Sequence, residues 1–300
     1  MELRHLRYFI SVADELSFSR AAEKLNISQP PLSQQIKKLE LELGLQLFRR
    51  VARGVELTQE GVVLSLYARR LMHDAEQLRS LAERLRGGEE GTLRLGVVGT
   101  SLLGELPALM RTIRAHMPLV TFQLEEIESG DQVKALLEHR IDVGVLRPPV
   151  EADSLELFPL SEEALVAAIP SDHPLAQRPL IRVADLKDEP FILFPRPLGE
   201  GLYDAVVSAC ASAGYSPRII HETDRMQTVV GLVATGAGVS IVPECVMRVS
   251  LPGVAYVSLG DSAPKSALSF AWSREAMNPV LMRFAKLVAA LLSLNPPVGC

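Results

Sequence analysis

The chain has 300 residues, which is more than one typical domain contains. Apolar residues make up 48% and charged residues 22%, a composition that supports buried cores and excludes global disorder. The net charge of −5 argues against nucleic-acid binding by the chain as a whole. However, residues 1–58 carry nine Lys and Arg against seven acidic residues, a balance of +2, and the remainder has a balance of −7. The placement of the basic residues is therefore more informative than their total.

The cysteines and the amino terminus predict a soluble, cytoplasmic protein. Cys210, Cys245 and Cys300 form no even, closely spaced set and no CxxC pair, so we expect reduced thiols, with a redox pair of Cys210 and Cys245 left open. The segment MELRHLRYFISVADEL has charges within its apolar run and no small-residue cleavage site, unlike a signal peptide. No run approaches the roughly 18 apolar residues of a membrane helix, so we expect no membrane contact.

Residues 3–57 predict three short helices followed by a basic hairpin. Ser17 and Ser28 are the expected N-caps of the second and third helices. Two prolines follow Ser28 in the first turn, where a missing N–H does no harm. An Arg-Gly pair between two short extended runs predicts the hairpin at 48–57. This is the layout of a winged helix-turn-helix, which inserts the second helix of its motif into the DNA major groove.

The helix that opens at Ser28 has a polar face suited to DNA. Its exposed positions carry side chains that can reach base edges and one cation for a phosphate: Gln29, Pro30, Ser33, Gln34 and Lys37. An ordinary solvated helix face is the alternative, and it would be preferred if this face stood alone. The hairpin downstream adds Arg49, Arg50 and Arg53, which can reach phosphates and the adjacent minor groove. Together the two features favour DNA binding.

Residues 58–86 predict one long helix with a heptad seam. Apolar residues recur at gaps of four and three, at Leu64, Ala68, Leu71, Ala75, Leu78, Ala82 and Leu85. A lone amphipathic helix packed on its own domain is the alternative. A helix of this length would then leave a narrow apolar stripe exposed, so the pattern favours dimerisation.

After the glycine-rich stretch 87–91 the pattern changes to alternating strands and helices. The expected strands are TLRLGVVG, VTFQLEEI, IDVGVL, ALVAAIP, FILFP, GVSIVP and LSFAW. This alternation predicts an α/β sheet of buried parallel strands. About 210 residues of such material usually form two lobes, with a ligand in the cleft at the strands' carboxyl ends.

The amino-terminal region strongly resembles the winged helix-turn-helix of the LysR-type transcriptional regulators. The resembling segments are LRHLRYFISVADELSFSRAAEKLNISQPPLSQQIKKLELELGLQLFRR and GVELTQEG, and AHMPLVTFQLEE, LLEHRIDVGVLR and GLVATGAGVSIVP resemble the family's effector domain. The resemblance implies a DNA-binding domain at 1–58, a linker and dimerisation helix at 59–90, and a two-lobed effector domain at 91–300 with the fold of periplasmic binding proteins. Its lobe I would comprise 91–162 and 267–300, and its lobe II 163–266.

The resemblance also implies which residues contact DNA. Family contacts fall on Gln29, Pro30, Ser33 and Gln34 of the third helix, on Arg53 of the wing, and on Arg50, which stands where relatives have an Arg facing phosphate. With Pro31 and Lys37 beside them, these residues form the predicted DNA-binding set. Many relatives have Arg at the position of Gln34, so the bases preferred here are left open.

In relatives that sense small carboxylates, hydroxyls and backbone amides at strand ends hold the ligand between the lobes. The matching residues here are Thr100, Ser101, Ser129, Arg147 and Arg196, with Leu202 and Tyr203 as an apolar wall. Such a set favours a small organic anion, held by hydroxyl donors and an Arg suited to bidentate contact. The alternative is that the hydroxyls are helix caps and that Arg147 pairs with a structural acid.

The resemblance implies a ligand-responsive regulator that activates transcription. Its expected partners are double-stranded operator DNA with an inverted repeat, a small carboxylated and aromatic-derived effector, RNA polymerase, and further copies of the chain in a dimer of dimers. No catalytic motif, cofactor motif or metal-ligand spacing is present in the sequence, so we expect no enzyme activity, no cofactor and no metal. The rivals are a solute-binding protein for transport, which has no use for a winged helix, and a DNA-binding protein that responds to no ligand.

Overall fold

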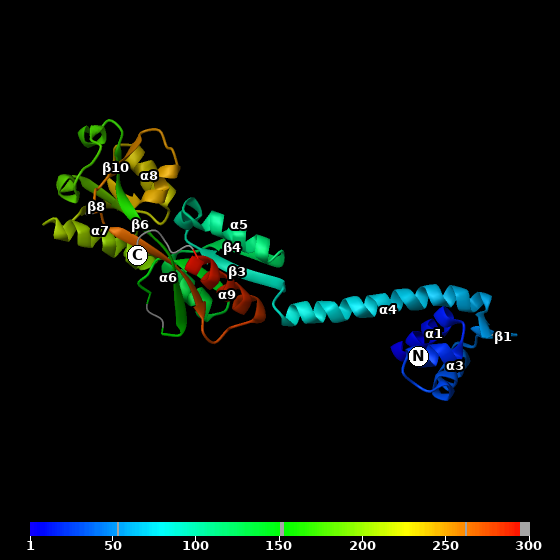
Figure 1. Cartoon of the computed structure of the whole chain (residues 1–300). Helices are drawn as coiled ribbons and strands as arrows, with labels where there is room; N and C mark the ends of the chain where they lie inside the picture. Colours follow the sequence, from blue (N-terminus) through cyan, green and yellow to red (C-terminus); the bar gives the residue numbers. More distant parts are fainter. Residues whose placement is uncertain (53, 151–152, 262, 295–300) are drawn as a thin grey trace. The chain divides into compact units, whose positions relative to one another are not determined.

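The computed structural model describes residues 1–52, 54–150, 153–261 and 263–294. The chain divides into two compact units, Met1–Arg84 and Leu85–Cys300, and Figure 1 labels several elements of each. Arg53, one of the predicted DNA contacts, lies outside the described residues, as does Cys300. None of the described helices combines the length and the apolar character that crossing a membrane requires.

The first unit has the predicted three helices, hairpin and long helix. These elements are α1 (Leu3–Glu15), α2 (Phe18–Lys24), α3 (Gln29–Leu43), β1 (Phe48–Val51), β2 (Gly54–Leu57) and α4 (Gln59–Arg86). Strands β1 and β2 pair antiparallel. Apolar residues from α1, α2, α3, the hairpin and the start of α4 form one core, in which Phe9 contacts Phe48 edge-to-face with ring centroids 5.5 Å apart.

Local signals define the ends of these helices. The Ser17 hydroxyl accepts a hydrogen bond from the Arg20 amide at 3.4 Å, as expected of an N-cap. Ser28 stands at the N-cap of α3 without a side-chain hydrogen bond, so the prolines and not the cap hydroxyl mark that start. Gly44 ends α3 with φ +67°, a left-handed conformation that glycine adopts without strain.

The second unit contains a seven-stranded mixed sheet with the order β10-β6-β11-β5-β3-β4, and β9 pairs with β6 off this path. Its strands are β3 (Glu90–Val97), β4 (Leu119–Glu126), β5 (Val143–Leu146), β6 (Leu155–Pro170), β9 (Ser240–Pro243), β10 (Val254–Ser258) and β11 (Lys265–Ser273). A separate parallel pair consists of β7 (Pro190–Leu193) and β8 (Arg218–Glu222).

The α-helices of this unit are α5 (Leu106–His116), α6 (Ser129–Leu137), α7 (Glu200–Ser212), α8 (Met226–Ala234) and α9 (Pro279–Leu294). Short 3₁₀ helices are η1 (Gly99–Leu103), η2 (Pro174–Gln177), η3 (Val183–Leu186), η4 (Arg196–Leu198) and η5 (Glu244–Arg248). The predicted α/β class is confirmed, with strands and helices in the expected alternation along most of the unit.

The expectation of a parallel sheet is only partly right. Strand β3 pairs parallel with β4 and β5, whereas β6, β9, β10 and β11 pair antiparallel. Strand β6 begins at Leu155, but the sequence pattern predicted only its second half. The pattern also missed β8 and β10. Pro159 resembles a strand breaker, but it lies where the β6–β11 register shifts, and such an irregularity tolerates a residue that cannot donate to the ladder.

Four hydrophobic clusters lie within the described part of the second unit, and we call the regions around the two largest of them lobe I and lobe II. The core of lobe I is formed by β3, β5, α5, α9 and part of β11, and that of lobe II by β7, β9, β10, α7 and the second half of β6. Strand β6 contributes Leu160 to the first core and Leu165 to the second. Strand β6 therefore runs from lobe I into lobe II.

Candidate functional site

Helix α3 exposes the predicted DNA-reading residues on one face. Gln29, Pro30, Pro31, Gln34 and Lys37 are exposed, and Ser33 is half-buried beside them. The opposite face carries Leu32, Ile36 and Leu39, each less than 2% exposed in the core of the unit. Since the apolar face anchors the helix, its amino-terminal polar face is free to enter a groove.

The two arginines on strand β1 of the hairpin differ in their electrostatic surroundings. Arg49 lies opposite Glu56 and forms an ion pair with it at 2.8 Å. Arg50 is exposed, and no described residue forms an ion pair or a side-chain hydrogen bond with it. Of the two arginines on β1, Arg50 is therefore the one available for a phosphate, whereas the charge of Arg49 is offset by its neighbour.

A cavity lies between lobe I and lobe II, and we call it the inter-lobe cavity. It encloses about 610 Å³ of space that no atom fills, a volume that includes the open solvent at its mouth. Of the seven predicted effector residues, four line it, namely Thr100, Ser129, Arg147 and Leu202. Most of its remaining wall is apolar, formed by Leu103, Phe194, Met226, Val230, Val246 and Val249 among others.

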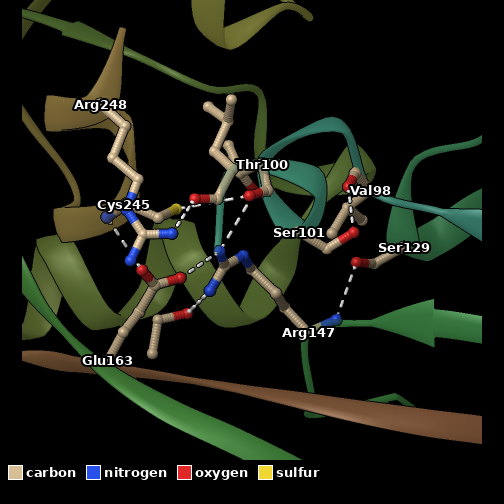
Figure 2. A network of polar contacts seen from close by, with 10 residues as sticks. Val98, Thr100, Ser101, Ser129, Arg147, Glu163, Cys245 and Arg248 are labelled. Atoms are coloured by element: carbon tan, nitrogen blue, oxygen red, sulfur yellow. Dashed lines mark hydrogen bonds and ion pairs between the residues drawn. The ribbon is translucent and has the colours of Figure 1, made fainter. Parts of the chain in front are cut away.

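Arg147 is the centre of the polar network that borders this cavity (Figure 2). It is 3% exposed, and its guanidinium donates to Glu163 Oε1 at 2.7 Å, Thr100 Oγ1 at 3.1 Å and Ser266 Oγ at 2.8 Å. Its backbone N–H donates to Ser129 Oγ at 3.0 Å. The charge of Arg147 is thus compensated by Glu163, so the predicted role as a free bidentate anion contact gives way to a role in positioning hydroxyls.

The two hydroxyls around Arg147 have their donor side unused. Thr100 Oγ1 and Ser129 Oγ each accept a hydrogen bond from Arg147, and neither donates to an acceptor within the described ranges. A hydroxyl provides one donor besides its lone pairs. Both residues are more than 90% buried and line the cavity, so each can donate to an acceptor group of a ligand.

Three predicted effector residues do not line the inter-lobe cavity. Arg196 forms a bidentate ion pair with Asp204, with N–O distances of 2.8 and 2.9 Å. The Asp204 carboxylate raises the pKa of Arg196 further above its ordinary value. Arg196 lies in an adjacent open hollow with Ser129. The Ser101 hydroxyl donates to the Val98 carbonyl at 2.7 Å, and Tyr203 packs against the core of lobe II. The order of the strands predicted the edge of the sheet at which these residues lie, but it did not predict the residues with which Arg196, Ser101 and Tyr203 interact.

Two carboxylates in the cavity wall escaped the sequence analysis. Glu126 is the last residue of β4, and Glu128 is the N-cap of α6. Burial, followed by the nearby charges of Glu126 and Asp224, raises the pKa of Glu128 to about 7. The segment Glu125–Ser129 contains three acids before the predicted hydroxyl, and this acidic run was the available signal.

The two described cysteines lie in different cores. Cys210 is buried in lobe II with β7 and α7, and Cys245 lies with α8, where its thiol donates to the Thr100 carbonyl at 3.4 Å. Burial raises the pKa of the Cys210 thiol. It also raises the pKa of the Cys245 thiol, to about 12. Because a thiolate is the reactive form, neither has the character of a redox sensor. Across the described residues, no group of three or more His, Cys, Asp or Glu is placed to hold a metal ion.

Comparisons with known proteins match both units of the chain. Residues 3–62 match the model of the bacterial regulatory helix-turn-helix proteins of the lysR family, and residues 86–293 match that of the LysR substrate binding domain. The chain is 38% identical to the HTH-type transcriptional regulator AlsR of Bacillus subtilis (strain 168), over 95% of this chain and 94% of the relative. It is also 38% identical to the regulator BenM of Acinetobacter baylyi (strain ATCC 33305 / BD413 / ADP1), over 87% and 86%.

Solved structures agree with the family models. The crystal structure of CbnR, a LysR family transcriptional regulator, superposes with a TM-score of 0.84 at 31% identity and covers 96% of this chain and 100% of its own. Full-length CbnR complexed with its target DNA superposes with a TM-score of 0.82 at 30% identity, covering 97% and 99%.

Proposed function

This chain belongs to the LysR family of transcriptional regulators, and on that premise we propose that it binds an inverted-repeat operator and senses a small carboxylated metabolite in the inter-lobe cavity. A helix-turn-helix domain and a substrate-binding domain on one chain form a regulator and not an enzyme. The observation that carries the effector proposal is the pair of buried hydroxyls, Thr100 and Ser129, held by Arg147 with their donors unused.

The DNA-binding surface consists of the exposed face of α3 and the hairpin. Gln29, Ser33 and Gln34 are assigned to base edges, while Lys37 and Arg50 are assigned to phosphates. The two amides fit adenine, whose N6 and N7 pair with one amide group. Arg50 supports this assignment because its charge is unpaired within the described part of the chain.

Pairing of α4 helices would present two such surfaces to the two halves of an operator. The seam residues Ala68 and Leu64 pack into the core of their own unit, whereas Leu71, Leu78 and Leu85 are 48%, 67% and 48% exposed. Three leucines at heptad spacing on one exposed helix face favour a second helix as their cover. We therefore place the dimer contact in the second half of α4, and a tetramer requires a further contact.

The carboxylate of the effector accepts hydrogen bonds from Thr100 and Ser129. The apolar wall around Phe194, Leu202 and Val230 then contacts the rest of the molecule, and an aromatic or branched aliphatic group fits such a wall. Binding energy that differs between two lobe arrangements would shift their populations and so alter the DNA complex. We propose activation through RNA polymerase, in the cytoplasm where the operator lies.

One experiment tests the sensor against a regulator without a ligand. Small organic acids are screened with the full-length protein by thermal shift. Footprints on the operator are then compared with and without the acids that raise the melting temperature. We expect a carboxylate to raise the melting temperature of the wild type and to leave that of a Thr100→Val, Ser129→Ala variant unchanged. A panel without any such shift would contradict the sensor proposal.

A further inference from the structure

We propose that the effector is zwitterionic, an amino-acid-like compound whose ammonium group binds Glu126 and Glu128 while its carboxylate binds Thr100 and Ser129. This inference rests on the proposed effector site and names the second charge that the ligand carries. It follows from the placement of two carboxylates in the wall of the inter-lobe cavity.

The two carboxylates flank the hydroxyl pair. Glu128 directly precedes Ser129 at the start of α6, and Glu126 lies against Gly99, the residue before Thr100. A methyl group built on Gly99 would lie 2.5 Å from Glu126 Oε1, so this carboxylate oxygen covers the start of η1. The donors for a carboxylate and the acceptors for an ammonium group therefore border the same cavity from neighbouring positions.

The charge of this wall is negative without a ligand. No described residue forms an ion pair or a side-chain hydrogen bond with Glu126 or Glu128. Among the described residues that line the cavity, the cationic side chain is Arg147, and its charge is compensated by Glu163. A ligand with carboxylates alone would face the exposed Glu126 and the half-buried Glu128, and Glu128 is ionised above its pKa of about 7, so like charges repel. A cationic group on the ligand removes this repulsion and satisfies both side chains.

The remaining wall accounts for the rest of such a ligand. Phe194, Leu202, Met226 and Val230 offer an apolar surface, and Gln227 adds a neutral polar group. An amino acid with an apolar side chain matches all three surfaces, whereas a polyamine would leave the hydroxyl donors without an acceptor.

The titration of Glu128 gives the inference a second readout. Its pKa of about 7 results from burial, with Glu126, Asp224 and Asp131 raising it and Arg225 lowering it. An ammonium group favours the ionised carboxylate, so amino-acid affinity should rise as the pH increases from 6 to 8. Binding at pH 6.5 should release a proton, which appears as a dependence of the calorimetric enthalpy on the ionisation enthalpy of the buffer.

The test uses matched ligands and the full-length protein. The twenty standard L-amino acids and their des-amino carboxylic acids are screened by thermal shift. Each amino acid that binds is then compared by calorimetry with its des-amino carboxylic acid and its des-carboxy amine. We expect the amino acid to bind at least ~10-fold more tightly than either analogue. The joint substitution Glu126→Gln, Glu128→Gln should weaken the amino acid ~10-fold or more, abolish the pH dependence, and strengthen binding of the des-amino acid, since the repulsion of its carboxylate is removed.

The control is Glu125→Gln, an equal change of charge one residue away that does not line the inter-lobe cavity. It should leave both affinities within ~2-fold of the wild type. A des-amino acid that binds the wild type as tightly as its amino acid would overturn the zwitterion and leave the carboxylate site standing. Failure of every amino acid and every des-amino acid to bind would overturn both proposals.

Discussion

At the scale of single residues, hydrogen-bond direction separates the roles in the inter-lobe cavity. Arg147 donates to Thr100, Ser129 and Glu163, so the hydroxyls act as acceptors within the protein and as donors toward the cavity. Ser101 is the opposite case, because its hydroxyl already donates to the Val98 carbonyl. Adjacent hydroxyls therefore differ in what they can offer a ligand.

The hydroxyl pair can be tested by removing one donor at a time. Ser129→Ala and Thr100→Val should each weaken a bound carboxylate by ~10- to 100-fold, since a hydrogen bond to a charged group contributes about 1.5–3 kcal/mol. Ser101→Ala is the control and should change affinity little, because Ser101 does not line the cavity. Calorimetry measures all three, and equal losses from Ser101→Ala and Ser129→Ala would contradict the assignment.

The elevated pKa of Glu128 also affects stability. In the unfolded chain its carboxyl ionises near 4.5, and in the folded chain near 7, so the folded state holds the proton more tightly between these values. Its contribution to the free energy of unfolding is present below pH 4.5 and is lost as the pH rises through 7. Relative to Glu128→Gln, the wild type should become less stable from pH 5 to pH 8. Urea titrations at each pH measure the difference, and a constant difference would contradict it.

At the scale of elements, cross-strand pairing decides which hairpin arginine can reach DNA. Arg49 faces Glu56 across the β1–β2 ladder, and Arg50 faces Val55. The same strand therefore carries one compensated and one uncompensated cation. Electrostatic affinity for DNA depends on the uncompensated one, because a cation already paired releases fewer counterions.

Salt dependence distinguishes the two arginines. Arg50→Ala should weaken binding to operator and to unrelated DNA alike and reduce the slope of log affinity against log salt by about 0.9 for each phosphate that is no longer neutralised. Arg49→Ala should have a smaller effect on the slope. Fluorescence anisotropy between 50 and 200 mM salt measures both, and a larger slope change for Arg49→Ala would reverse the assignment.

The exposed half of α4 predicts its role in assembly. Leu71→Asp with Leu78→Asp places two charges on the exposed leucine face and should yield monomers, or smaller assemblies than the wild type, at micromolar concentration. His73→Asp with Ser80→Asp adds the same charges two positions away on the exposed helix surface and should leave the assembly unchanged. Sedimentation velocity measures the mass of the assembly. An unchanged mass in the leucine variant would exclude a dimer contact through the exposed leucines of α4.

At the scale of the whole molecule, two compact units carry separate cores. Phe9 belongs to the core of Met1–Arg84, whereas Glu163 compensates the buried Arg147 in Leu85–Cys300. Removing one partner of a buried ion pair leaves an uncompensated charge, which costs about 3–5 kcal/mol. Loss of a buried phenylalanine side chain costs a similar amount, about 3–5 kcal/mol.

Calorimetric unfolding should therefore show two transitions that respond to different substitutions. Glu163→Gln should lower the midpoint of the effector unit and leave that of the DNA-binding unit in place, and Phe9→Ala should do the reverse. Ligand added to the wild type should raise the midpoint temperature of only that transition whose midpoint Glu163→Gln lowers. A single transition that shifts with both substitutions would show that the units unfold together.

The amino-acid sequence alone determined the helix-turn-helix, its hairpin and the order of most strands. These features depend on local signals, such as the Ser17 cap, the glycine at 44 and the apolar periodicity of α3, which act within a few residues. The same signals indicated that Thr100, Ser129 and Arg147 follow strand ends at one edge of the sheet.

Only the tertiary structure decided which of the charged side chains remain unpaired. The partner of Arg147 is Glu163 on a crossing strand, that of Arg196 is Asp204 one helix away, and Glu126 and Glu128 have none among the described residues. Ion pairing and desolvation depend on side-chain direction and on elements distant in the chain, and periodicity carries neither. For this reason the sequence indicated the edge of the sheet at which we propose that the effector binds, while the proposed second charge of the effector rests on the fold.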